Sequence, residues 1–203
     1  NLNGSSSYTI REVKTVDGYY YFEDITTDTT EDGKNQSVTA VDNSINYQIA
    51  KVDDNGDYVQ GVTLELTDIT DADNPVKVEL PNNGITTNEP FKLDKKLIAE
   101  HTYELVESEY VAGVYKATNI TFTVPKYGTS EVTTITMMDE TTNISVKKVD
   151  NYGKPVAGAL MQILIPETEE VVYEFTSTDD EHGTDISKYV KGGERYILRE
   201  SEA

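Results

Sequence analysis

A lysine, a glutamate and an aspartate recur in a fixed order along this chain, each at the end of an alternating apolar motif. The lysine motifs are YQIAKVD (47–53) and ISVKKVD (144–150), and the glutamate motifs read Tyr-x-[Ile/Leu]-x-Glu. The aspartate motifs are SVTAVDN (37–43) and TITMMDE (134–140). The ionisable residues of these motifs are Glu12, Asp42, Lys51, Glu107, Asp139, Lys148 and Glu200.

Strand geometry predicts that these ionisable side chains point toward the protein interior. Side chains alternate between the two faces of a strand, so each one shares a face with the apolar residues two and four positions before it. The same parity separates two adjacent lysines, with Lys148 directed inward and Lys147 outward. Charges almost never enter a core unless they are paired or chemically used.

Burial would prepare these groups for one reaction. Desolvation disfavours the charged forms, which lowers the pKa of a lysine and raises that of a carboxylic acid. A neutral amine in contact with a protonated carboxyl, and with a second carboxyl to carry protons, can condense to an amide. Proximity supplies much of the rate, since effective molarities of about 10⁵–10⁸ M are available to well-oriented groups. The alternative is a buried salt bridge, or a lysine whose stem is buried and whose ammonium reaches the edge.

Composition limits the class of protein. The chain has 203 residues, a formal charge of −20 and no cysteine. The acidic balance argues against nucleic acid as a partner, because phosphates need Lys and Arg. No apolar run approaches the ~20 residues of a membrane span, and neither a signal peptide nor an anchor is visible, so we expect an excerpt of a longer extracellular chain. No Cys or His cluster suggests a metal site, and no cofactor is expected.

The elements that must carry the motifs are short strands separated by turns. Thr, Val, Ile and Tyr dominate alternating segments such as VTLELTD and ITFTV, and DDNGD, LPNNG and NYGKP mark turns between them. Only 91–101 and 183–190 could be helical. The pattern predicts an all-β sandwich.

The repeat of the motifs predicts tandem β-domains with a period of roughly 95 residues. Within one unit the order is lysine strand, glutamate strand, aspartate strand. We therefore expect a complete domain at 44–142, the C-terminal part of a preceding domain at 1–43 and the N-terminal part of a further domain at 143–203.

These motifs resemble the collagen-adhesin B-type domains of Gram-positive surface proteins, which include SpaA-like pilins. KVDNYGKPVAGALMQI (148–163) is similar to the opening of that family, and YILRESEA (196–203) to its Tyr-x-Leu-x-Glu element. The ITFTV strand and the endings TITMMD and SVTAVD look closest to the fibronectin-binding-protein domain that was split into the SpyTag/SpyCatcher pair.

The resemblance implies a tandem transthyretin-like (inverse immunoglobulin) sandwich with spontaneous isopeptide bonds. Carried across, Lys51 would bond to Asp139 with Glu107 as the catalytic residue. Lys148 and Glu200 would await an acid beyond the chain, and Glu12 and Asp42 would serve a lysine before it.

The acceptor in the first unit has two candidates. Many family members use Asn, and Asn43 directly follows Asp42. Strand parity favours Asp42, because Glu140 occupies the position that matches Asn43 in the next copy.

The function expected from these residues is a structural stalk of a bacterial surface adhesin, pilus or other extracellular fibre, with neighbouring repeats as partners and no catalytic turnover. One alternative is a host-ligand-binding adhesin domain that recognises a surface protein or glycan, with the long insert 67–101 as the place to look. Another is a fibre of identical subunits joined by strand complementation, with Lys148 bonded to Asp42 of the next chain.

Two short motifs have weaker interpretations. DDNGD (53–57) resembles a calcium loop, but its twelfth position is Leu64 rather than Glu, so a hairpin turn is favoured. VPK (124–126) resembles the lysine motif of sortase-assembled pilins, but Pro and Gly have ordinary reasons to stand in a turn.

Overall fold

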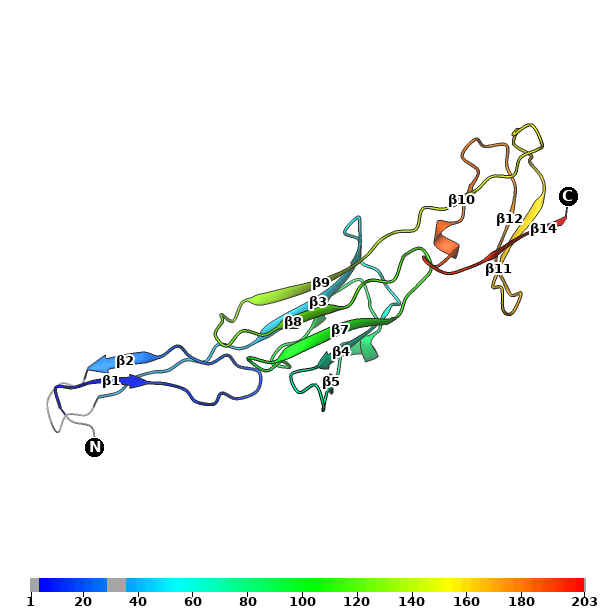
Figure 1. Ribbon diagram of the computed structural model, residues 1–203. Coiled ribbons are helices and arrows are strands. Elements are labelled where there is room, and N and C mark those ends of the chain that lie inside the picture. Colours follow the sequence, from blue (N-terminus) through cyan, green and yellow to red (C-terminus); the bar gives the residue numbers. More distant parts are fainter. Residues whose placement is uncertain (1–3, 29–35, 203) are drawn as a thin grey trace.

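The computed structural model describes residues 4–28 and 36–202 (Figure 1). Apart from two short 3-10 helices, every regular element in that part of the chain is a strand, which confirms the prediction of an all-β protein. Strands β1 (Ser7–Ile10) and β2 (Ile25–Asp28) lie at one end of an elongated molecule. Strands β11 (Leu160–Leu164), β12 (Val171–Thr176) and β14 (Ile197–Glu202) lie at the other end.

The middle of the chain forms a two-sheet sandwich from β3 to β9. One sheet has the order β6-β3-β9 and the other the order β5-β4-β7-β8. The strands are β3 (Asn46–Asp53), β4 (Thr63–Asp68), β5 (Val76–Val78), β6 (Phe91–Lys92), β7 (Thr102–Glu109), β8 (Ile120–Thr123) and β9 (Val132–Asp139), with the 3-10 helix η1 at Pro81–Gly84.

Alternation along the strands builds the core between the two sheets. Ile49 from one sheet and Leu64, Leu66 and Leu105 from the other are at most 2% exposed. The exposed residues between them, such as Thr136 beside the buried Met137, face solvent. The period of two seen in the sequence therefore separates core from surface.

The last part of the chain, residues 143–202, forms a smaller and more open arrangement. A sheet of order β12-β11-β14 faces a two-stranded sheet β10-β13, and a separate apolar cluster lies between them. The elements are β10 (Ser145–Val146), β11 (Leu160–Leu164), β12 (Val171–Thr176), β13 (Thr184–Asp185), the 3-10 helix η2 (Ser187–Tyr189) and β14 (Ile197–Glu202).

Two sequence expectations about local structure are corrected. Residues 91–101 contain β6 and turns rather than a helix, because Lys95 and Glu100 take left-handed φ values of 57° and 66°. The expected strand at 37–43 is not formed, and Val38 and Val41 are 42% and 66% exposed. Its counterpart β9 pairs with the lysine strand β3, and residues 1–43 contain no second copy of that lysine motif.

Within the described ranges, no helix has the length and apolar character needed to cross a bilayer.

Candidate functional site: a buried lysine between two carboxyl groups

Two neighbouring parallel strands bring the lysine and the aspartate together. β3 pairs with β9 so that Lys51 is level with Met137 and Asp53 with Asp139. Lys51 and Asp139 both point into the sandwich, two residues apart along the pair. The parallel pairing aligns the C-terminal ends of the two strands, where Lys51 and Asp139 lie.

The glutamate comes from the opposite sheet. Glu107 lies near the end of β7, after the buried Tyr103 and Leu105 on the same face. The face of β7 turns toward β3 and β9 across the core, so Glu107 meets the other two side chains from the far side.

The three side chains are in direct contact. Lys51 Nζ donates a hydrogen bond to Asp139 Oδ1 and lies 3.7 Å from Glu107 Oε2. Lys51 is 3% exposed, and Glu107 and Asp139 are 0% exposed. We refer to these residues as the middle trio; the sequence placed all three on one apolar face, and they do meet there.

One important contact was not visible in the sequence. The backbone N–H of Ala117 donates to Glu107 Oε2 at 2.6 Å. This N–H belongs to the loop after β7, which we call the glutamate loop of the middle domain (residues 110–117). It holds Glu107 Oε2, the same carboxylate oxygen that lies 3.7 Å from Lys51 Nζ.

Burial changes the protonation of both acids. Desolvation raises the pKa of Glu107, although the Ala117 N–H and the Lys51 ammonium act in the opposite direction. Desolvation also raises the pKa of Asp139, again against the effect of Lys51. Glu107 Oε1 and Asp139 Oδ2 are buried and have no hydrogen-bond partner within the described residues. A proton retained on one carboxyl would leave the trio electrically neutral and would lower the cost of these unpaired oxygens.

The last unit holds two of the three groups. Lys148 Nζ lies 3.1 Å from Glu200 Oε2, and these side chains are 25% and 34% exposed. Lys147 is exposed and Lys148 is half-buried, as parity predicted. The expectation that Glu200 faces a closed core is not met, because Leu198 beside it on the same face is 49% exposed and nothing in the described chain covers this part of β14.

In the first unit, the predicted site residues Glu12 and Asp42 lie in different environments. Glu12 is half-buried, and its Oε2 accepts a hydrogen bond from the Phe22 backbone N–H at 3.1 Å. Asp42 is exposed at the surface. Its neighbour Asn43 binds the middle domain instead, with its side-chain amide donating to the Gly128 carbonyl at 2.9 Å.

Residues 53–57 form a tight turn. Asp53 Oδ1 accepts from the backbone N–H groups of Asn55 and Asp57, both at 2.9 Å, so the carboxylate is occupied within its own turn. No cluster of three or more potential metal ligands occurs among residues 4–28 and 36–202.

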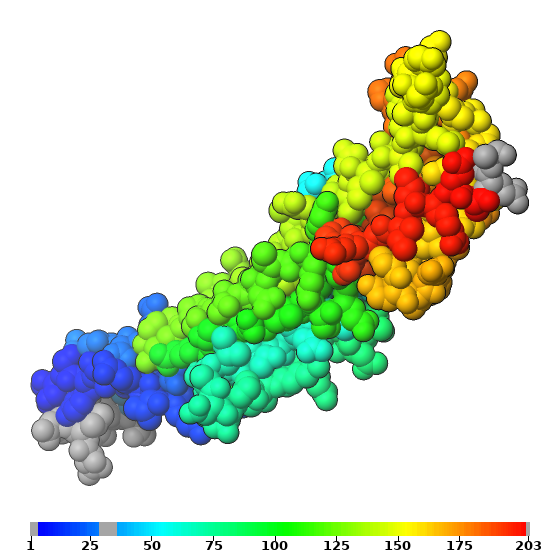
Figure 2. Space-filling view, turned by 45° about the vertical axis from the view of Figure 1, so that its right-hand side comes forward, coloured from blue at the N-terminus to red at the C-terminus, as the bar shows by residue number. Residues whose placement is uncertain are grey.

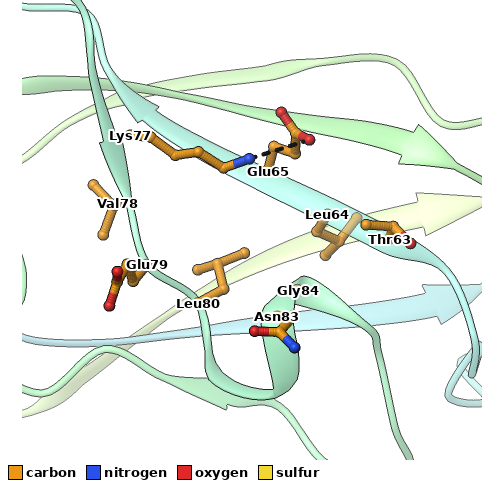
Figure 3. Close-up of a pocket in the computed structure, with 9 residues that line it drawn as sticks. All are labelled: Thr63, Leu64, Glu65, Lys77, Val78, Glu79, Leu80, Asn83 and Gly84. Atoms are coloured by element: carbon orange, nitrogen blue, oxygen red, sulfur yellow. Dashed lines mark ion pairs between the residues drawn. The ribbon is translucent and has the colours of Figure 1, made fainter.

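The long insert 67–101 borders a surface hollow of about 370 Å³ (Figure 3). Lys77 and Glu65 form an ion pair of 3.3 Å at its edge, and both side chains are largely exposed. Leu64, Leu80 and Gly84 also line the hollow. The host-ligand alternative stays a prediction.

Comparison with known proteins agrees with the fold of the middle domain. Residues 45–140 match the family model of the SpaA prealbumin-like fold domain, which confirms the transthyretin-like sandwich expected from the sequence. No curated protein matches the chain.

Several solved structures resemble the chain at a distance. A streptococcal ancillary pilin is 18% identical with a TM-score of 0.36, and the match covers 97% of this chain and 66% of that one. The Bacillus anthracis TIE protein is 16% identical with a TM-score of 0.38, covering 98% and 37%. The shaft pilin SpaA from Lactobacillus rhamnosus GG is 11% identical with a TM-score of 0.41, covering 78% and 87%. This chain thus spans less than two thirds of the first two, and similarity this remote carries no function across.

Proposed function

We propose that this chain is part of a rigid extracellular stalk, in a surface adhesin or pilus of a Gram-positive bacterium, in which an internal amide bond joins Lys51 to Asp139. The observation that carries the proposal is the enclosure of the middle trio, in which an amine touches one carboxyl, lies near a second, and is shielded from water.

The reaction follows from the positions of the atoms. Lys51 Nζ, in its neutral form, attacks Cγ of protonated Asp139, and Glu107 accepts a proton from the nitrogen. The C–OH bond of Asp139 then breaks, and the departing hydroxyl takes that proton and leaves as water. One C–N bond replaces one C–O bond, no oxidant is needed, and Glu107 is regenerated. Because the amide is neutral, the cost of burying an ammonium with a carboxylate disappears with the reaction.

The same chemistry extends by proposal to the flanking units. Lys148 and Glu200 would serve a bond to an aspartate that residues 143–203 do not supply, and Glu12 would serve Asp42. Asp42 is favoured over Asn43 as the acceptor because Asn43 corresponds to Glu140 in its main-chain bonding: the Asn43 carbonyl accepts from Tyr20 N–H at 2.9 Å, as the Glu140 carbonyl accepts from Tyr115 N–H at 2.8 Å. The protein has no substrate to turn over, since each site reacts once, on itself.

The test is the intact mass of the denatured full chain. We expect the wild type to be lighter than its sequence by one water, and Lys51→Ala to have the full sequence mass. Glu107→Gln keeps an acceptor for the Ala117 N–H but cannot carry the proton, so it should slow the reaction by about 10²–10⁴-fold. A wild-type chain of unaltered mass after prolonged folding would refute the proposal.

A further inference from the structure

The same set of main-chain hydrogen bonds occurs at both borders between units. At the first border Gly18 N–H donates to the Leu97 carbonyl at 3.1 Å, and the Gly18 carbonyl accepts from Ile45 N–H at 2.8 Å. At the second border Gly113 N–H donates to the Val190 carbonyl at 2.9 Å, and the Gly113 carbonyl accepts from Thr142 N–H at 2.8 Å. The geometry is therefore a repeating feature of the array.

Glycine is required at the centre of this junction. Gly18 and Gly113 take φ values of +86° and +97°, which L side chains rarely adopt. A Cβ on Gly18 would lie 2.7 Å from the Lys95 carbonyl oxygen in the next unit. At Gly18 the missing Cβ therefore allows the two main chains to approach closely, whereas at Gly113 a Cβ would lie 3.8 Å from Lys188 Cα and the φ value alone favours glycine.

The junction glycine lies in the loop that also holds the glutamate. Within the glutamate loop of the middle domain, Gly113 bonds the next unit, Tyr115 N–H bonds the Glu140 carbonyl and Ala117 N–H bonds Glu107 Oε2. The first unit repeats this order with Gly18, Tyr20 and Phe22, whose N–H donates to Glu12 Oε2. Glu140 directly follows Asp139, so one short loop contacts the glutamate, the end of the aspartate strand and the following unit.

Further contacts join the last unit to this loop. Gly192 N–H donates to the Val114 carbonyl at 2.8 Å, and Tyr110 Oη donates to the Gly192 carbonyl at 3.0 Å. Thr142 Oγ1 donates to the Ser187 carbonyl at 2.9 Å. Apart from the bond of Thr142, these hydrogen bonds between the two units converge on residues 110–114.

We infer that docking of each following unit positions the glutamate of the unit before it, so that amide formation at Lys51 is promoted by the junction with residues 187–194. This inference rests on the proposed amide chemistry. Gly113, Tyr115 and Ala117 act as positioning residues through their backbone, because only three residues lie between Gly113, which bonds the next unit, and Ala117, which bonds Glu107. Crosslinking along an array would then be favoured only where consecutive domains have docked.

The experiment perturbs the junction with a substitution in the last unit, outside the glutamate loop itself. A Cβ on Gly192 would lie 2.3 Å from the Tyr115 ring, so Gly192→Val should displace the loop. Gly153→Val is the control for backbone strain in the same unit: Gly153 takes a φ of +81°, so valine is strained there, but a Cβ meets nothing within 4 Å and does not touch the loop. Full chains are made in a short cell-free pulse, quenched in acid denaturant at intervals, and weighed intact to give the rate of water loss.

We expect Gly192→Val to slow the loss of water at least about tenfold, since misplacing a reacting group by about 1 Å can cost 10²-fold in rate. Gly153→Val should match the wild type. Adding Tyr115→Ala to Gly192→Val removes the clashing ring and should restore the rate. Amide hydrogen exchange should show loss of protection at Gly113 and Ala117 while the β3 amides stay protected.

The outcomes separate this inference from the proposed function. Equal rates for Gly192→Val and Gly153→Val, with Gly113 unprotected in the former, would overturn the inference and leave the amide chemistry intact. A wild type that never loses water would overturn both. If Gly192→Val prevents the last unit from folding, Gly192→Ala against Gly153→Ala provides the same comparison, since the clash arises at Cβ.

Discussion

Lys51 is buried in contact with two acidic side chains, and this burial determines the chemistry of all three groups. It is held between two carboxyl groups that are themselves 0% exposed, and desolvation raises the pKa of both acids. An ammonium with two carboxylates would leave a net charge of one in the core. If one carboxyl group instead keeps its proton, the three side chains together are neutral. The same desolvation that makes the arrangement costly makes it reactive.

At the residue scale, we predict an unusual pH dependence for the uncrosslinked domain. In Lys51→Met the two acids remain buried without their cation, so their pKa values stay raised in the folded state. As pH rises, these two carboxyl groups lose their protons at a lower pH in the unfolded chain than in the folded one. The free energy of unfolding should therefore fall as pH rises from about 4, the ordinary carboxyl pKa, toward the raised pKa values.

Urea unfolding of Lys51→Met at a series of pH values measures this trend. The double variant Lys51→Met, Glu107→Gln removes one of the titrating groups and should have a shallower slope. Equal slopes for Lys51→Met and the double variant would show that Glu107 is not desolvated.

At the scale of elements, the site depends on turns as much as on strands. Helix η1 returns the chain beneath β4, where Gly84 takes a φ of +81° and a Cβ would lie 2.2 Å from the Leu64 carbonyl oxygen. Leu64 is level with Glu107 in the β4–β7 pair. The turn therefore supports the strand that flanks the glutamate.

We predict that Gly84→Ala destabilises the middle domain much more than Gly56→Ala. Gly56 takes a similar φ of +87°, but a Cβ there meets nothing within 4 Å. Both variants incur the left-handed cost of about 1–2 kcal/mol, and only Gly84→Ala adds overpacking of about 1–3 kcal/mol. Urea denaturation in the Lys51→Ala background measures both, and equal losses would contradict the close approach of η1 to β4.

At the scale of the whole molecule, the units follow one another in an extended array (Figure 2). The chain enters the middle sandwich through β3 and leaves it through β9, which are adjacent and parallel. Tension applied along the array reaches these two strands first. An amide between Lys51 and Asp139 would carry that tension directly and protect the 88-residue span between them.

We predict that single-molecule pulling distinguishes the crosslinked from the uncrosslinked chain. In Lys51→Ala the middle domain should unfold and release roughly 300 Å of chain, at about 3.4 Å per residue. The wild type should lack this extension, because only residues outside the closed loop can extend. The same extension in both proteins would rule out the amide as a mechanical element.

Much of this architecture follows from local pattern. Alternation with a period of two placed Lys51, Glu107 and Asp139 on apolar faces, and the recurrence of their motifs indicated the tandem order. The three side chains do lie on buried faces, because the direction of a side chain in a strand depends only on its position along that strand. The tandem order stays a prediction.

Only the tertiary structure decided which of these inward-facing side chains are buried. The same motifs give a buried trio in the middle domain, a half-exposed Lys148–Glu200 pair in the last unit and an exposed Asp42 in the first. Burial depends on whether other strands cover a face, and the parallel contact of β3 with β9 joins segments far apart in the chain. The Ala117 N–H that holds Glu107 is a backbone group common to every residue type except proline, so only the folded path of the loop could identify it.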